Sequence, residues 1–138
     1  MTQPATVQRP KPIATSDTKE FWESINRREF KIPKCNACGK WFYYPRLYCP
    51  YCLSQDWQLQ TASGKGTVYS FSIVRHGFGP VWRNFVPYVP ALVDLAEGAR
   101  MTVNIVGCTP EEVKVDMAVQ VDFLEVADGN LIPVFKPA

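Results

Sequence analysis

Four cysteines carry the clearest chemistry in this sequence of 138 residues. They form two Cys-x-x-Cys pairs that are separated by ten residues. Zinc binds four thiolates at the corners of a tetrahedron, and a set of four leaves no open coordination position. We therefore predict one structural zinc ion per chain rather than a catalytic one. The predicted ligands are Cys35, Cys38, Cys49 and Cys52.

The same spacing is compatible with two disulfides or with a redox pair. Residues 1–13 contain no apolar leader core, which argues against disulfides and leads us to expect a cytoplasmic protein. A redox Cys-x-x-Cys normally lies in a βαβ unit, and this sequence lacks that pattern. The fifth cysteine, Cys108, has Val106 nearby, and we expect it to be a buried small apolar residue.

The linker between the two cysteine pairs, residues 39–48, contains four consecutive aromatic residues at positions 41–44. We predict that it forms a β-hairpin whose aromatic side chains cover the metal. Gly39 suits the tight turn after the first pair. The second pair is followed by Leu53 instead, so it lacks that glycine.

The residues that a complete enzyme needs are not apparent in the sequence. The chain has a single histidine, His76, and it has no base beside a plausible nucleophile. We see no nucleophile-elbow motif, no phosphate-binding glycine loop and no carboxylates paired at catalytic spacing. These absences favour a binding or scaffolding subunit, in which His76 is structural.

Composition limits the class of protein. Apolar residues make up 46% and charged residues 20%, as in globular proteins. No run of 18 apolar residues exists, so we expect no membrane-spanning helix. The net charge of +2 is too small to indicate nucleic-acid binding by itself. The front half of the chain is basic and the back half is slightly acidic, which suggests two modules.

The N-terminal part predicts an arm followed by a helix. Residues 1–16 read as a flexible arm, and residues 17–29 read as an amphipathic helix. Asp17 and Glu20 have the spacing of a capping box, and an apolar face follows at helical spacing. The helix docks either on this chain or on a partner, and periodicity does not separate the two. The apolar face consists of Phe21, Trp22 and Ile25.

The remainder predicts a mainly β fold: a zinc ribbon at residues 30–60 and a five-stranded OB-fold barrel at residues 61–138. Alternating apolar positions indicate five strands, and Thr109–Glu112 predict one helical turn between the third and the fourth. Five short strands with this turn are typical of an OB-fold. The predicted strands are 67–74, 88–95, 101–106, 118–126 and 131–135.

The segment between the first two barrel strands, residues 75–87, is rich in glycine, proline, aromatic residues and arginine. OB-folds bind ligands with this loop and the adjacent face. Arginine beside aromatic residues can stack on a nucleobase or hold a phosphate. The alternative is a structural loop whose aromatic side chains pack on the end of the barrel. The candidate binding residues are Arg75, Phe78, Trp82 and Arg83.

Taken in order, these motifs resemble the acyl-CoA-associated zinc-ribbon/OB-fold family, with its rubredoxin-like zinc ribbon, over about residues 17–137. The resemblance rests on the two cysteine pairs with the Tyr44-Pro45-Arg46 spacer, and on the amino-acid sequence of the barrel strands. Leu53 departs from the glycine usual in the family. The matching segments are Phe21-Trp22, residues 35–40, residues 49–52, Trp57, residues 66–70, residues 87–93 and residues 133–137.

This resemblance implies an accessory subunit of a thiolase-superfamily enzyme. Family members are similar to the small subunit of benzoylsuccinyl-CoA thiolase and to the OB-fold partners of steroid side-chain aldolases. In such complexes a thiolase-fold partner carries the catalytic residues, and a hetero-tetramer or larger assembly is expected. A CoA ester would then be a ligand of the complex, with Arg75, Phe78, Trp82 and Arg83 contacting CoA or the partner.

Two other functions stay open at this point. Zinc ribbons and OB-folds also bind nucleic acids, although the weak overall charge makes this the less favoured interpretation. A free-standing acyl-CoA binding protein is the third possibility.

Overall fold

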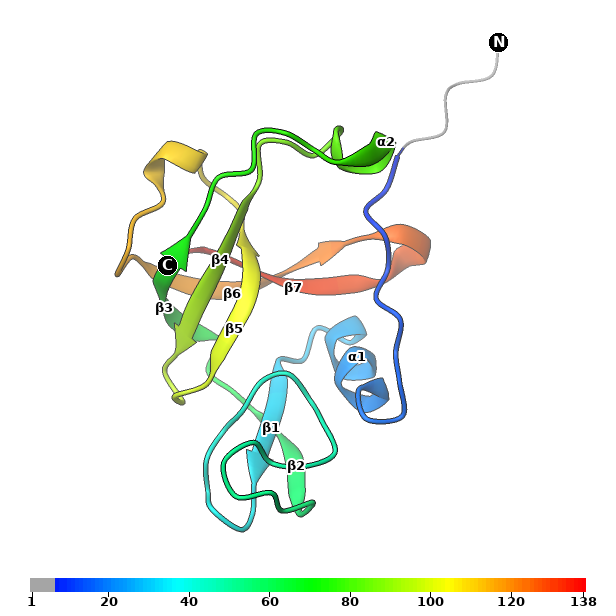
Figure 1. The fold of residues 1–138 in the computed structure, drawn as a ribbon, viewed down its shortest axis with the longest axis vertical. Helices are drawn as coiled ribbons and strands as arrows, with labels where there is room; N and C mark the ends of the chain where they lie inside the picture. The colour runs from blue at the N-terminus through cyan, green and yellow to red at the C-terminus, as the bar shows by residue number, and fades with distance from the viewer. Residues whose placement is uncertain (1–6) are drawn as a thin grey trace.

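The computed structural model describes residues 7–138 and contains an N-terminal helix, a small zinc-ribbon hairpin and a closed barrel (Figure 1). This confirms the predicted fold class. None of the described helices is long and apolar enough to cross a membrane. The elements are α1 (Lys19–Asn26), β1 (Lys31–Cys35), β2 (Trp57–Thr61), β3 (Lys65–Phe71), α2 (Gly79–Trp82), β4 (Val89–Leu95), β5 (Arg100–Ile105), the 3₁₀ turn η1 (Pro110–Glu112), β6 (Ala118–Glu125), the 3₁₀ turn η2 (Ala127–Gly129) and β7 (Leu131–Pro137).

The barrel strands run in the order β3-β4-β5-β7-β6, and β3 closes the barrel against β6. All neighbours are antiparallel except β5 and β7, which are parallel. In β4 every second side chain is buried, from Val89 to Leu95, as expected for a strand with one face toward a core. The order is that of an OB-fold, in which the third and fifth strands lie side by side.

The first barrel strand differs from the prediction. A β-bulge between Val68 and Ser70 shifts the register against β4, and a bulge changes the face to which a side chain points. Tyr69 is therefore 51% exposed, whereas Phe71 packs against the core. Residues two apart share a face in an unbroken strand, so the bulge separates two aromatic side chains that simple alternation would place together. The guanidinium of Arg100 lies 3.6 Å from the centroid of the Tyr69 ring.

Helix α1 docks on its own chain, which answers the question that periodicity left open. Phe21 and Ile25 are 0% exposed, and they belong to the same apolar cluster as Phe135 of the barrel. The predicted capping box is absent, because the helix begins at Lys19 and its N-cap residue is Thr18. The Thr18 hydroxyl instead accepts a hydrogen bond from the backbone N–H of Thr15, at 2.9 Å.

Residues 7–16, predicted as part of a flexible arm, contain no helix or strand but contact the barrel. The carbonyl of Arg9 accepts a hydrogen bond from the backbone N–H of Ala127, and its guanidinium lies 4.2 Å from the centroid of the Phe85 ring. Lys11 pairs with Asp128 at 2.9 Å. Residues 1–6 of the predicted arm lie outside the described residues.

We expect the helix to be required for stability. Phe21→Ala should lower the free energy of unfolding by about 3–5 kcal/mol, because it leaves a cavity in the shared core. The matched control is Glu23→Ala on the exposed side of the same helix, which should change stability by at most about 0.5 kcal/mol. Denaturant unfolding of the zinc-loaded protein measures both values. Equal, small effects would mean that the docked helix contributes little.

Candidate functional site

The sulfur atoms of the four predicted zinc ligands lie within 4.8 Å of one another. Cys35 and Cys52 are separated by 3.6 Å between sulfurs, and Cys38 and Cys49 by 3.7 Å. These distances exceed a disulfide bond of about 2.05 Å. They match the edge of about 3.8 Å that follows for a tetrahedron with Zn–S bonds of about 2.3 Å. The donor set therefore fits zinc.

Both Cys-x-x-Cys turns close in the same way. The backbone N–H of Gly39 donates to the carbonyl of Cys35 at 3.0 Å, and that of Leu53 donates to Cys49 at 2.9 Å. Gly39 and Leu53 both have a positive φ, of 76° and 65°. A leucine in the left-handed region is strained. The chain therefore keeps the turn geometry at Leu53 without the glycine that would adopt it freely.

The ionisation of the thiols explains why the cluster suits a cation. At Cys49 burial opposes ionisation, but hydrogen bonds from the backbone N–H groups of Tyr51 and Cys52 and from neighbouring thiols lower its pKa to about 7. At Cys52 a backbone hydrogen bond from Ser54 lowers the pKa, but burial and the other three sulfurs raise it to about 12. The full set of thiolates thus needs a positive charge between them.

The linker between the cysteine pairs does not form the predicted hairpin. Within residues 7–138 its only strand-like contact is a bridge between Lys34 and Trp41, and the partner of β1 is β2. Of the four consecutive aromatic residues at 41–44, Phe42 covers the sulfur cluster, where it packs with Trp57 at 5.7 Å between ring centroids. The other three pack against the main core, so the linker joins the metal site to the barrel: Trp41, Tyr43 and Tyr44.

Cys108 lies away from the sulfur cluster and packs, half-buried, against the main core. Burial raises the pKa of its thiol, and the charge of Glu112 adds to this effect. It packs as a small apolar residue, but it is half-buried rather than fully buried as predicted.

The candidate loop residues do not converge on one pocket. Arg75 pairs with Glu111 at 2.9 Å, and this contact lowers the pKa of the Glu111 carboxyl. Phe78 is 88% exposed. Trp82 packs against Phe85, with the ring centroids 6.1 Å apart. Arg83 is exposed and takes part in none of the ion pairs found within residues 7–138.

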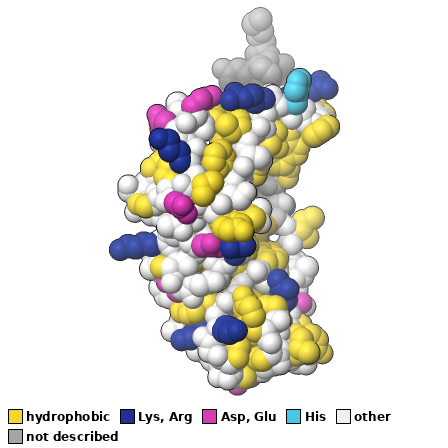
Figure 2. Space-filling model, turned by 60° about the vertical axis from the view of Figure 1, so that its left-hand side comes forward, with side chains coloured by type: hydrophobic (Ala, Val, Ile, Leu, Met, Phe, Trp, Pro, Cys, Tyr) yellow, Lys and Arg dark blue, Asp and Glu magenta, His cyan; other side chains and the backbone are white. Residues whose placement is uncertain are grey.

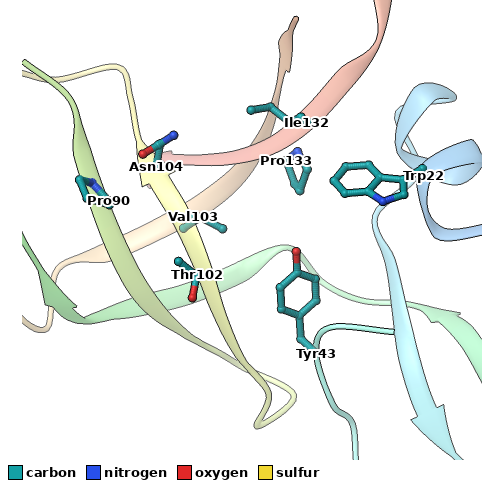
Figure 3. A pocket seen from close by; sticks show the side chains of 8 residues that line it. All are labelled: Trp22, Tyr43, Pro90, Thr102, Val103, Asn104, Ile132 and Pro133. Atoms are coloured by element: carbon teal, nitrogen blue, oxygen red, sulfur yellow. The ribbon is translucent and has the colours of Figure 1, made fainter. Parts of the chain in front are cut away.

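Sequence reasoning missed an apolar slot between α1, the linker and the barrel (Figure 3). Its volume is about 250 Å³. Trp22 forms one wall, and its indole N–H donates to the Tyr44 hydroxyl at 2.6 Å. Burial, with a smaller contribution from Tyr44, raises the pKa of Tyr43. The aromatic run of residues 41–44 was the available signal, although it was assigned to the metal.

The fold and the four-cysteine cluster define a zinc-ribbon/OB-fold protein. Two protein-family models match the chain: "ChsH2, rubredoxin-like zinc ribbon domain" over residues 22–58 and "ChsH2, C-terminal OB-fold domain" over residues 59–124. A "DUF35 domain-containing scaffold protein" of Methanocaldococcus jannaschii is 36% identical over 79% of this chain and 78% of its own length. The chain belongs to this DUF35 family.

Two longer relatives and one solved structure are also similar. A "Probable enoyl-CoA hydratase alpha subunit" of Thermomonospora curvata is 38% identical over 94% of this chain, which spans only 40% of that protein. The "3-oxo-4,17-pregnadiene-20-carboxyl-CoA hydratase alpha subunit" of Mycobacterium tuberculosis is 31% identical, and the chain spans 38% of it. The solved "Ltp2-ChsH2(DUF35) aldolase" has a TM-score of 0.81 and 36% identity, covering 92% of this chain and 98% of that one.

We predict one zinc ion per chain, held by the four clustered thiolates. Cys38→Ser should abolish stoichiometric zinc and unfold the ribbon, because structural zinc contributes on the order of 10 kcal/mol to folding. Cys108→Ser is the control and should keep the metal. Elemental mass spectrometry after gel filtration reads the zinc content. Zinc retained by the first variant, or lost by the second, would contradict this ligand set.

Proposed function

We propose that this chain is a non-catalytic accessory subunit of a thiolase-like enzyme, either an acyl-CoA thiolase or a retro-aldolase. One observation carries the proposal, namely the 36% identity and TM-score of 0.81 to the chain of the Ltp2-ChsH2(DUF35) aldolase. The partner would carry the catalytic residues. This chain would stabilise the partner and help to bind or channel the acyl-CoA.

The chemistry of the described residues favours a non-catalytic, accessory role. The thiol cluster offers four ligands and no open position. His76 is exposed, in a loop outside the helices and strands. Among residues 7–138 no other cluster with metal-binding geometry is present. A chain of this kind contributes surface and rigidity rather than a nucleophile or a Lewis acid.

The distribution of charge favours this function over nucleic-acid binding. On the face seen in Figure 2, basic and acidic side chains are interspersed with apolar ones. On β4 and β5, Arg100 is held by Asp94 at 2.6 Å, and Arg75 is held by Glu111. Binding to a phosphate backbone requires unpaired cations along one face.

Turnover assays test the proposal directly. The chain alone should neither cleave nor condense CoA esters, because it holds no catalytic set. The thiolase-fold protein alone should be insoluble or inactive, and the two expressed together should be active. Turnover by the isolated chain would overturn the accessory role. A thiolase-fold protein that is soluble and equally active with and without this chain would also overturn it.

The loop between β3 and β4 gives a second test. Replacing Arg75 and Arg83 together by alanine should weaken binding of the CoA ester by the complex, or assembly, by about tenfold. Arg83 should account for most of the loss, because Arg75 is already paired with Glu111. The charge-matched control replaces Lys19 and Lys65, which lie elsewhere on the exposed surface. Titration calorimetry of each complex measures the difference, and equal affinities would remove the loop arginines from the site.

A further inference from the structure

The barrel wall has an opening between β5 and β7. These parallel strands pair only at Ile105 and Phe135, whereas every residue of β5 has a partner on β4. Figure 3 shows β5 and β7 diverging from the region of Asn104, with Trp22 and Tyr43 beside the space between them. The slot of about 250 Å³ lies in this opening.

A proline explains why the pairing stops. The backbone N–H of Val106 donates to the carbonyl of Phe135 at 2.8 Å, which aligns the two strands at their C-terminal ends. Two residues earlier on β7 is Pro133, which has no N–H to continue a parallel ladder. Backbone groups alternate in direction along a strand, so those of Thr102 point toward the opening as those of Val106 do. The Thr102 carbonyl therefore lacks its donor from β7.

The lining of the slot determines which chemistry fits it. No charged residue is among the described residues that line it. The Thr102 side chain and the Tyr43 hydroxyl lie at its edge (Figure 3), and most of the remaining surface is apolar. The lining residues are Trp22, Tyr43, Pro90, Thr102, Val103, Asn104, Ile132 and Pro133.

We propose that this opening binds a short, extended and uncharged segment of a partner polypeptide, which adds to the free edge of β5 at Thr102. One apolar side chain of the segment lies between Trp22 and Tyr43. This inference rests on the proposed function, under which the partner is the catalytic subunit. Free strand edges recruit extended peptides in this way, with backbone hydrogen bonds giving affinity and a pocket giving specificity.

The dimensions and the charge of the slot support this occupant. A cavity of about 150 Å³ can hold benzene, so a volume of about 250 Å³ accommodates a large aliphatic or aromatic side chain. A phosphate or carboxylate is disfavoured, because no cationic side chain is among the described residues that line the slot. A peptide strand instead brings backbone N–H groups, which the Thr102 carbonyl needs.

Substitution in the slot is the first test, with the tagged chain and the catalytic subunit that co-purifies with it. Thr102→Arg places a charge and bulk in the opening and should weaken partner binding by about tenfold or more. The matched control is Thr67→Arg, at another exposed threonine, on β3 of the same barrel, which should bind as the wild type does. Zinc content and thermal unfolding of both variants establish that the fold is kept.

Hydrogen exchange at single residues is the second test and requires no variant. In the free chain the Thr102 amide should exchange faster than that of Val103, which faces β4 on the same strand. In the complex the Thr102 amide should slow by about tenfold or more, while the Val103 amide stays unchanged.

The outcomes separate the two proposals. A complex that forms normally with Thr102→Arg and leaves the Thr102 amide unprotected overturns the strand-addition site and keeps the accessory role. Failure to find any catalytic partner overturns both. Protection of Thr102 by acetyl-CoA alone, without a partner chain, assigns the slot to a small ligand and also overturns the strand-addition site.

Discussion

Four sulfur atoms within 4.8 Å of one another are the constraint on which the rest of this structure depends. Four thiolates at such distances repel one another unless a cation lies between them. A cation bound by these thiolates would fix both ends of the linker at residues 39–48. Phe42 then covers the cluster, and the next residue, Tyr43, is held against the barrel beside the slot. The linker therefore connects the metal site, through Phe42, to the proposed partner site, through Tyr43.

The second organising interaction is a single apolar core that α1, the ribbon and the barrel share. Phe21 of the helix, Ile32 of β1 and Phe135 of β7 are each 0% exposed and belong to one cluster. A ribbon hairpin of this size buries little surface by itself. Docking it and the helix on the barrel gives the three parts a common core. The faces that remain exposed are then available for another protein.

Local chemistry predicted the four-cysteine cluster, the helix, the five barrel strands and the 3₁₀ turn after Thr109. Local patterns failed where long-range contacts decide. The bulge that exposes Tyr69 depends on the register with β4. Thr18 rather than Asp17 is the N-cap, and its hydroxyl accepts a hydrogen bond from the Thr15 N–H instead of capping the helix. The slot between β5 and β7 was not predictable either, because its walls come from Trp22, Tyr43 and Pro133, which only the closed fold brings together.

The central claim is that this DUF35 chain works as a zinc-stabilised subunit of a larger acyl-CoA enzyme. Native mass spectrometry of the tagged chain, purified from its own host, tests it most directly. The account predicts one zinc per copy of this chain and a stoichiometric thiolase-sized protein in the same particle. A zinc-loaded chain that carries only nucleic acid or CoA, with no protein partner, would contradict it.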